Sequence, residues 1–245
     1  MNQYKKQVGW VVAALLFGLF SGIARADADG DALLSKLKKL RPDLPIERVR
    51  PSPVKDIYAL ELKGGSMLYG TRDARFLFAG DLYQMGDEDL VNLAELRRSV
   101  QRKAILDTVK PDDMVIFSPE GETKAVVDVF TDVDCTFCQK LHREVPRMNE
   151  LGIEVRYLAF PRKGIGSSSY DKMVSTWCAK DPRQALTDSK AGKPIPAKSC
   201  DNPVAWEYEL GHQVGVTGTP AIVLEDGSLY PGYLPAEKLA QILGL

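Results

Sequence analysis

The chain has 245 residues, of which 44% are hydrophobic and 27% are charged, and its formal net charge is −1. A chain of this size and composition is expected to be globular and long enough for two domains, each with its own core. The nearly neutral charge and the lack of a basic cluster argue against a nucleic-acid partner.

Residues 1–26 have the pattern of a secretory signal peptide. Two lysines precede an apolar core from Val8 to Phe20, and Ala24-Arg25-Ala26 matches the small-x-small pattern of a cleavage site. The apolar core is shorter than the about 20 residues of a membrane span, although an uncleaved anchor is an alternative. We therefore expect an exported, soluble mature chain that begins near Asp27. All four cysteines would lie there, in a compartment where disulfides persist.

Residues 27–86 are predicted to form a small domain of one helix and an antiparallel meander. A helix is expected over Asp31–Leu40 because leucines recur on one face. These leucines are Leu33, Leu34, Leu37 and Leu40. From Ile46 to Met85 the pattern changes to period two, as at Phe76 and Phe78, which indicates strands. So small a domain leaves a sheet edge exposed, and we expect self-association to cover it.

Residues 87–110 are predicted to form a linker helix between two differently patterned regions. The helix is expected to open at Gly86–Asp89, where acidic side chains favour a helix N-terminus. Its apolar positions form one narrow stripe: Leu93, Leu96, Val100 and Ala104. Its basic positions are expected to face solvent: Arg97, Arg98, Arg102 and Lys103.

Residues 111–245 contain a strand–helix–strand unit followed by a strand–strand–helix unit. Strands are expected at Val115–Ser118, Lys124–Phe130, Ile153–Phe160, Ala221–Leu224 and Ser228–Tyr230, and a last helix at Pro235–Leu243. Asp226-Gly227 is a typical hairpin dipeptide. This order around a Cys-x-x-Cys predicts a thioredoxin-like α/β domain with an insertion at about 161–200, so the fold class of the whole chain is α+β.

The Cys-x-x-Cys pair, Cys135 and Cys138, follows an apolar strand and opens a helical pattern. The first amides of a helix have no backbone acceptor and lie at the positive end of its dipole. We therefore expect the pKa of Cys135 to fall below the free value of about 8.5. Asp132 and Asp134 should oppose this shift, because a nearby carboxylate disfavours a second negative charge. In this hypothesis Cys135 is the more exposed nucleophile and Cys138 resolves the mixed disulfide.

The other two cysteines, Cys178 and Cys200, are predicted to form a structural disulfide that fixes the insertion. A loop of this length contributes about 3 kcal/mol in the chain-entropy description. A second redox-active pair is an alternative, but neither cysteine has the strand-to-helix setting of Cys135. A zinc site formed by all four cysteines is a second alternative. It is disfavoured because structural zinc usually uses two closely spaced pairs, and Cys178 and Cys200 are not close in the sequence. We therefore expect neither a metal nor a cofactor.

Several segments together resemble the DsbC family of periplasmic disulfide isomerases. They are PSPVKDIYALEL, LYGTRDARFLFAGDLY, VFTDVDCTFCQKLH and GVTGTPAIVLEDG. The resemblance covers nearly the whole mature chain. One departure is the dipeptide Thr136-Phe137, where family members commonly carry Gly-Tyr, and this difference bears on redox poise and rate.

The resemblance implies a V-shaped homodimer joined through residues 27–86, with an apolar cleft that holds misfolded clients. It also implies a cis bond between Thr219 and Pro220, which places the backbone of Thr219 against Cys135 to pair with a substrate strand. Phe137, beside the active sulfur, is then expected to touch substrate. An ordinary turn proline is the commoner case on sequence alone.

The resulting hypothesis is a thiol–disulfide isomerase that reshuffles wrong disulfides in exported proteins. Because Cys135 must stay reduced in an oxidising compartment, an electron donor is needed, and the resemblance implies a membrane reductant of the DsbD type. Two alternatives are a dithiol oxidase or sulfenic-acid reductase of the DsbG type, and a dimeric holdase that binds unfolded chains without chemistry.

Overall fold

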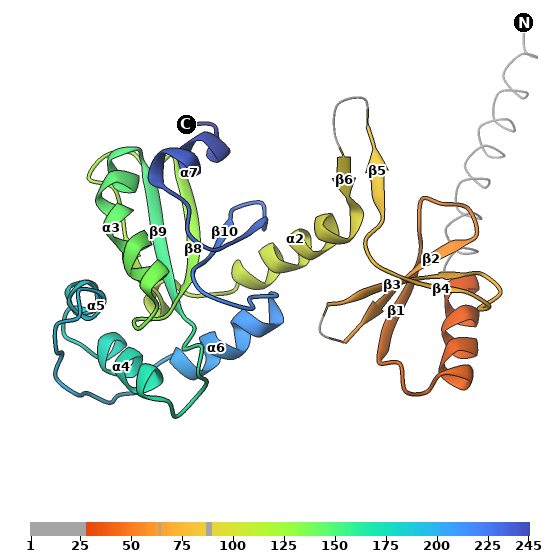
Figure 1. The fold of residues 1–245 in the computed structure, drawn as a ribbon, viewed down its shortest axis with the longest axis horizontal. Coiled ribbons are helices and arrows are strands. Elements are labelled where there is room, and N and C mark those ends of the chain that lie inside the picture. Colours follow the sequence, from red (N-terminus) through yellow and green to blue (C-terminus); the bar gives the residue numbers. More distant parts are fainter. Residues whose placement is uncertain (1–27, 64, 87–89) are drawn as a thin grey trace, which may run out of the picture. The chain divides into compact units, whose positions relative to one another are not determined.

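The structure, a computed structural model, describes residues 28–63, 65–86 and 90–245 and divides into two compact units between Ala94 and Glu95 (Figure 1). The predicted signal peptide, residues 1–26, lies outside the described residues. Among the residues that are described, no helix is both long and apolar enough to cross a membrane.

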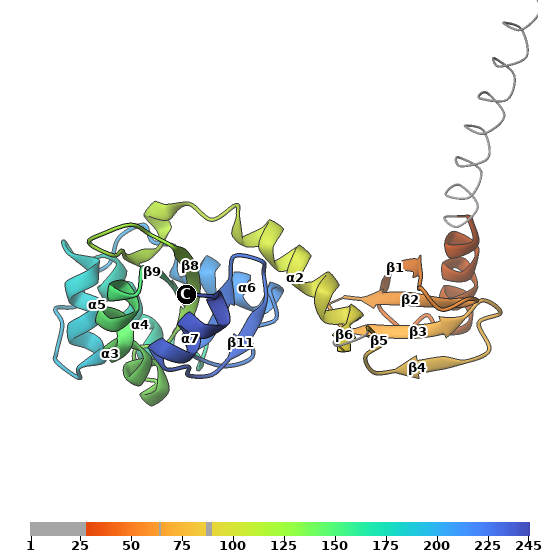
Figure 2. The ribbon, with the colours of Figure 1, turned by 90° about the horizontal axis from the view of Figure 1, so that it is seen from above.

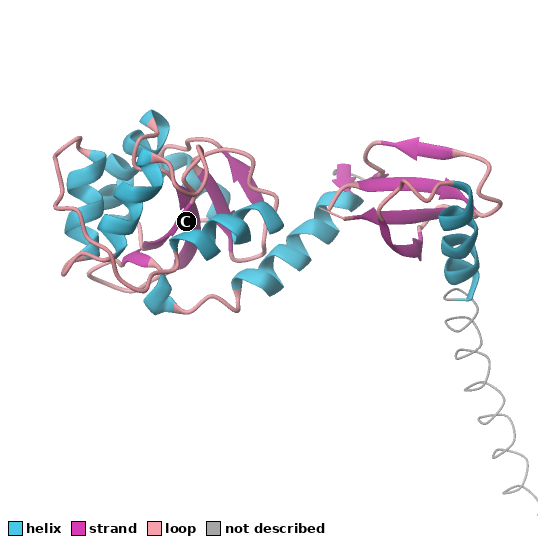
Figure 3. Cartoon of the chain, turned by 90° about the horizontal axis from the view of Figure 1, so that it is seen from below, coloured by secondary structure: helices cyan, strands magenta, loops and turns pink. Residues whose placement is uncertain are grey.

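The first unit packs one helix, residues 28–40, against an antiparallel sheet of order β1-β2-β3-β4 (Figure 3). The strands are β1 (Ile46–Pro51), β2 (Ile57–Leu62), β3 (Met67–Thr71) and β4 (Leu77–Ala79). Its core consists of Leu33, Leu37, Ile46, Tyr58 and Leu60. The predicted helix and meander are therefore confirmed. Leu40 is 57% exposed and does not share the buried face that its spacing predicts, because it is the last residue of the helix.

A short hairpin follows this sheet and corrects the predicted start of the linker helix. Strands β5 (Tyr83–Met85) and β6 (Leu90–Asn92) pair antiparallel, so α2 begins only at Leu93 and ends at Leu106. The Asn92 side chain accepts a hydrogen bond from the amide of Ala94 at the start of α2, a common way to begin a helix. The acidic residues expected in the first turn, 87–89, lie outside the described residues.

The second unit is built on a five-stranded sheet of order β11-β10-β8-β9-β7, in which only β8 and β9 are parallel (Figure 1). The strands are β7 (Val115–Phe117), β8 (Ala125–Thr131), β9 (Ile153–Ala159), β10 (Ala221–Leu224) and β11 (Leu229–Pro231). The helices are α2, η1 (Pro111–Asp113), α3 (Thr136–Glu150), α4 (Ser168–Trp177), α5 (Pro182–Lys190), α6 (Val204–Gln213) and α7 (Ala236–Leu243). This is the thioredoxin arrangement that the sequence predicts.

Helices cover both faces of this sheet (Figure 2), and side chains of the central strands β8, β9 and β10 enter two cores. On β8, Val127 and Val129 enter the core under α3 and α7, whereas Phe130 enters the core under α6. This period of two follows from the pleat of a strand. Both faces of β8 are buried, so its end is held firmly where the Cys-x-x-Cys segment begins.

The linker helix packs in a way that the sequence does not predict. Arg102 is only 3% exposed, and Leu96 and Val100 of the predicted apolar stripe are 54% and 64% exposed. Arg102 Nε donates to the Val214 carbonyl (2.8 Å), and its Nη1 donates to the carbonyl of Gly227. The expectation that Arg102 faces solvent is wrong, because these carbonyls give its charge buried acceptors on the second unit.

Gly227, in the predicted hairpin dipeptide, allows α2 to approach so closely. Its φ is +82°, which favours glycine, and a Cβ at this position would overlap the backbone carbonyl of Ser99 in α2. The turn between β10 and β11 therefore contacts the helix backbone directly.

The inserted segment supplies α4 and α5, and Cys178 is joined to Cys200 by a disulfide that spans 22 positions. The bond links the end of α4 to the chain that leads into α6. Met173, Val174 and Leu186 of these helices enter the core that also contains Leu141 of α3. The insertion is thus part of the folded unit, beside the helix that carries the Cys-x-x-Cys pair.

Candidate active site

Cys135 is the N-cap residue of α3, four positions after the end of β8. Its backbone is extended, with φ −87° and ψ 119°, and its carbonyl accepts the amide of Gln139. The first amides of α3 are therefore directed toward the region of its sulfur, as the sequence predicts.

Several contacts lower the pKa of the Cys135 thiol. The largest contribution is a hydrogen bond from the Cys138 side chain, and burial opposes it. The Thr219 side chain, the Cys138 backbone amide and the positive charge of Arg162 also favour the thiolate. The predicted direction of the shift thus comes mainly from the Cys138 thiol, and the helix amide and a cation that the local sequence does not contain add to it.

Cys138 has the opposite preference. Burial raises the pKa of this thiol, and its hydrogen bond to the Cys135 thiolate raises it further. The residue is 0% exposed and lies on the buried face of α3 with Leu141 and Met148. The pair therefore divides into one sulfur that favours the anion and one that keeps its proton.

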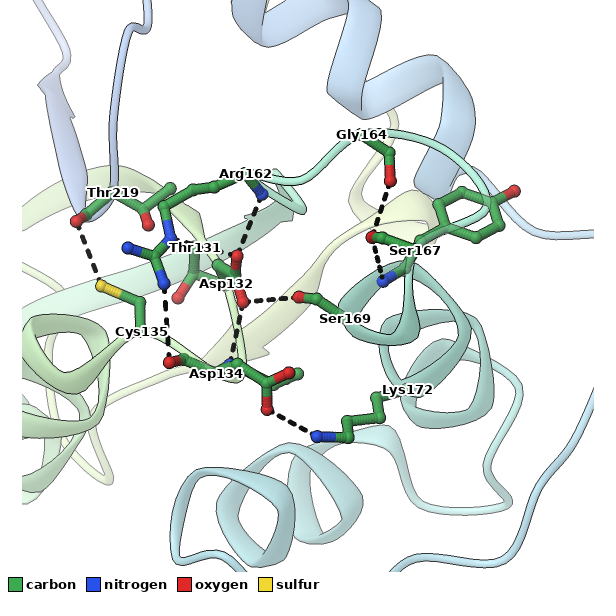
Figure 4. A network of polar contacts seen from close by, with 12 residues as sticks. Thr131, Asp132, Asp134, Cys135, Arg162, Gly164, Ser167, Ser169, Lys172 and Thr219 are labelled. Atoms are coloured by element: carbon green, nitrogen blue, oxygen red, sulfur yellow. Dashed lines mark hydrogen bonds and ion pairs between the residues drawn. The ribbon is translucent and has the colours of Figure 1, made fainter.

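Thr219 and Pro220 lie against the first cysteine, and the peptide bond between them is cis. The Cys135 thiol donates to the Thr219 carbonyl, with 3.2 Å between Sγ and O (Figure 4). Cys135 is expected to be the more exposed cysteine, but in this state both are buried and the two residues differ only as 1% against 0% exposed. The reason is tertiary, because the segment before β10 covers the start of α3.

The acidic residue that precedes the pair is neutralised by a network from the insertion (Figure 4). Asp132 is 1% exposed and accepts from the Ser169 hydroxyl (2.6 Å), the Arg162 amide (2.9 Å) and Arg162 Nε (3.2 Å). Burial alone would raise the pKa of Asp132, but these bonds outweigh it and lower the pKa. Asp134 in turn pairs with Lys172 Nζ at 2.7 Å.

Arg162, which sequence analysis missed, changes the electrostatic argument. The two carboxylates were expected to disfavour a thiolate, but Arg162 compensates Asp132 and itself favours the thiolate at Cys135. One signal in the sequence could have identified it. Arg162 follows β9, β9 is parallel to β8, and the carboxyl ends of neighbouring parallel strands meet at one edge of a sheet.

The remaining residues singled out in the sequence fall into two places. Phe137, which the resemblance expects to touch substrate, is 61% exposed beside the cysteines in the first turn of α3. Cys178 and Cys200 are bonded to each other, so a zinc site of all four cysteines would lack two thiolate ligands. The free thiols of the described residues are Cys135 and Cys138.

A thioredoxin-like sheet that presents a Cys-x-x-Cys pair at a helix N-terminus defines a thiol–disulfide oxidoreductase. The comparisons with known proteins agree. Residues 111–245 match the thioredoxin-like domain family, and residues 24–95 match the N-terminal domain family of disulfide bond isomerase proteins.

The similarity extends over almost the whole chain. The thiol:disulfide interchange protein DsbC of Escherichia coli K12 is 37% identical over 228 residues, which cover 93% of this chain and 92% of that protein. DsbC of Salmonella typhimurium LT2 is 38% identical over 234 residues, or 96% of this chain and 94% of that protein. The chain belongs to the DsbC family of thiol:disulfide interchange proteins.

A solved structure supports the same assignment for part of the chain. The crystal structure of a disulfide interchange protein from Neisseria gonorrhoeae is 33% identical and superposes with a TM-score of 0.50. The match covers 56% of this chain and 96% of that one.

Proposed function

We propose that this enzyme reshuffles wrong disulfides in exported proteins in the periplasm, with Cys135 as nucleophile and Cys138 as resolving thiol. The observation that carries the proposal is the opposite protonation preference of the two sulfurs at the start of α3. A thiolate attacks a disulfide, whereas a thiol does not, so only Cys135 is ready to begin the exchange.

The exchange proceeds by two displacements. The Cys135 thiolate attacks one sulfur of the client disulfide, the client S–S bond breaks, and the other client sulfur leaves as a thiolate. That thiolate can attack another disulfide of the client, and the client thiolate displaced there then attacks the Cys135–client bond, which releases the Cys135 thiolate and completes an isomerisation. Otherwise Cys138 loses its proton and attacks Cys135, so that the client leaves reduced and the enzyme disulfide takes the oxidised state.

Substrate binding is proposed to involve the segment that covers Cys135. In this state the thiol donates to the Thr219 carbonyl, so a client strand that pairs with Thr219 and Pro220 supplies a competing N–H donor for that oxygen. The thiol is then freed and can ionise as the client disulfide approaches. Phe137, which is 61% exposed, offers an aromatic surface to the same client.

Homodimerisation through residues 27–86, with residues 87–110 as linker, is part of the proposal. Strand β4 is at the edge of the first sheet, and Phe76, Leu77 and Phe78 are 55%, 37% and 52% exposed. An apolar edge strand favours pairing with a second copy. Phe78→Glu is expected to convert a dimer to a monomer in sedimentation, whereas Val54→Glu, a matched exposed site outside β4, leaves the dimer intact.

The enzyme must be kept reduced to isomerise disulfides. A membrane reductant of the DsbD type would deliver two electrons to the Cys135–Cys138 disulfide and restore both thiols. Residues 1–26 are proposed as the cleavable signal peptide that brings the chain to the periplasm. Trapping by a Cys138→Ala variant would identify the reductant and the clients together, because the mixed disulfide at Cys135 then persists.

The test of the proposed function is the recovery of activity by a scrambled, disulfide-rich protein. The unmodified chain is expected to restore activity, and Cys135→Ser is expected to abolish the effect. Full reshuffling by Cys135→Ser would overturn the proposal. A second candidate, a holdase, is favoured by the exposed Leu96 and Val100 on α2, and it predicts that a Cys135→Ser, Cys138→Ser double variant still suppresses aggregation.

A further inference from the structure

A buried lysine of the insertion contacts the strand end beneath the cysteine pair. Lys190, the last residue of α5, is 4% exposed and its Nζ donates to the Thr131 hydroxyl at 2.6 Å. Thr131, the last residue of β8, is 0% exposed, and its hydroxyl, as a hydrogen-bond donor toward the Cys138 sulfur, lowers the pKa of that thiol. A continuous polar path thus connects the Lys190 ammonium to the resolving thiol.

Lys190 also borders an open cavity. A cavity of about 880 Å³ lies between α3, the end of α5 and the loop that follows β7, and Lys190 is among its lining residues. Thr131 and Cys138 do not line this cavity. Lys190 is therefore the residue through which a proton from the buried Cys138 could reach water.

We propose that Lys190 exchanges a proton with the Cys138 thiol through the hydroxyl of Thr131 during thiol–disulfide exchange. The inference rests on the proposed function, in which Cys138 must lose its proton before it attacks Cys135. Sequence analysis gave no signal for it, since 52 positions separate Cys138 from Lys190.

The charges around Lys190 make the transfer depend on the state of Cys135. Burial lowers the pKa of Lys190 to about 8, while thiolates at Cys138 and Cys135 and the carboxylate of Asp132 raise it. When Cys135 is bonded to a client, its negative charge is lost and the lysine pKa falls, so Lys190 becomes a better proton acceptor.

The other groups that face Lys190 remain neutral and do not compete for the proton. The Tyr157 ring lies 5.4 Å from Nζ, and burial raises the pKa of this phenol well above its usual value. Burial and the charge of Lys190 lower the pKa of His142 to about 3. The Thr187 hydroxyl donates its proton to the Arg183 carbonyl, so this hydroxyl must accept a hydrogen bond from His142 Nε2–H. The neutral imidazole therefore carries its hydrogen on Nε2, and its Nδ1 accepts a hydrogen bond from the Tyr157 hydroxyl.

The proton and electrons balance as follows. From the neutral amine of Lys190, the Cys138 proton passes to the Thr131 hydroxyl oxygen while the Thr131 hydroxyl proton passes to Lys190 Nζ, which becomes the ammonium. The Cys138 thiolate then attacks Cys135, the Cys135–client bond breaks, and its electron pair leaves on the client sulfur. Lys190 releases its proton to water in the cavity. When a dithiol reduces the enzyme disulfide, the lysine returns a proton to the departing Cys138 sulfur.

The test is a stopped-flow reaction of the reduced chain with 5,5′-dithiobis(2-nitrobenzoate), which releases one coloured thiolate when Cys135 attacks and a second when Cys138 attacks. Lys190→Arg keeps the charge but cannot accept a proton, because arginine stays ionised. The Lys190→Arg variant is expected to leave the rate of the first release close to that of the unmodified chain. The rate of the second release is expected to fall about 100-fold at about pH 7. Lys190→Met should slow both releases.

The pH profile separates proton transfer from a purely electrostatic role. The second release of the unmodified chain should level off at or below about pH 8, the pKa of Lys190. In Lys190→Arg, and in Thr131→Val, which removes the linking hydroxyl, the rate of the second release should instead keep rising about tenfold per pH unit. Thr131→Ser restores the hydroxyl and should restore the plateau. Lys193→Met, at an exposed lysine three positions on, is the matched control and should match the unmodified chain.

The inference is overturned if Lys190→Arg or Thr131→Val gives the second release and plateau of the unmodified chain. A result in which only Lys190→Met is slow overturns it too, because charge alone would then suffice. If the unmodified chain gives no second release, the proposed dithiol function itself fails, and that outcome is independent of the variants.

Discussion

Arg102 offers the sharpest test of how the linker helix is held, because an arginine in a polar helix would ordinarily be a surface residue. Its guanidinium is 3% exposed and donates to the carbonyls of Val214 and Gly227 and to the carboxylate of Glu95. Arg102→Met keeps a long apolar stem and removes all three hydrogen bonds.

The expected loss can be worked from these contacts. A hydrogen bond to a charged group contributes about 1.5–3 kcal/mol, so the two carbonyls account for about 3–6 kcal/mol. The Glu95 carboxylate, whose side chain is 39% exposed, adds little because water screens it. Methionine avoids the cost of desolvating a guanidinium, which offsets part of the loss. We expect Arg102→Met to lower the free energy of unfolding by about 2–4 kcal/mol.

Urea denaturation followed by tryptophan fluorescence measures this loss of stability in the second structural unit, which contains Arg102. Without residues 1–26, the remaining tryptophans are Trp177 and Trp206, and both belong to the second unit. Lys103→Met is the control, since Lys103 is a neighbour on α2 with an exposed ion pair to Asp107, and we expect no measurable change. A loss below about 1 kcal/mol in Arg102→Met, or an equal loss in the control, would refute the reasoning.

Three further predictions concern the core and the site. Arg162→Met should raise the pKa of Cys135, because it removes a positive charge that favours the thiolate, and the midpoint of alkylation rate against pH should move upward. An unchanged midpoint would contradict this. Gly211→Ala places a Cβ about 2.5 Å from a buried phenylalanine ring and should cost about 1–3 kcal/mol in urea unfolding, unlike Gly121→Ala, where space is open. Burial raises the pKa of Glu207 well above its usual value, so the folded chain holds this proton while the unfolded chain loses it above about pH 4.3. The stability contributed by Glu207 therefore falls as pH rises. The Glu207→Gln variant should be more stable than the unmodified chain at about pH 8 but not at about pH 4. An equal difference in unfolding free energy at both pH values would rule this out.

Local patterns were sufficient to predict most of the fold. Short apolar runs rich in β-branched and aromatic residues in Lys124–Phe130 and Ile153–Phe160 predict two buried strands, and the structure has strands at Ala125–Thr131 and Ile153–Ala159. These predictions succeed because side-chain periodicity is set by backbone geometry, which nearby residues determine. The prediction failed at Leu90–Asn92, where pairing with Tyr83–Met85 forms a strand in place of the first turn of a helix.

The sequence alone determined where the Cys-x-x-Cys pair lies, since a strand, a short turn and a helix around Cys135 and Cys138 fix one sulfur at a helix N-terminus whatever surrounds it. Only the tertiary structure decided which charged groups reach that pair. Arg162 and Lys190 lie 24 and 52 residues beyond Cys138, and Arg102 is buried rather than solvated. The physical reason is that electrostatic and hydrogen-bond contacts depend on distance in space, which sequence separation does not set.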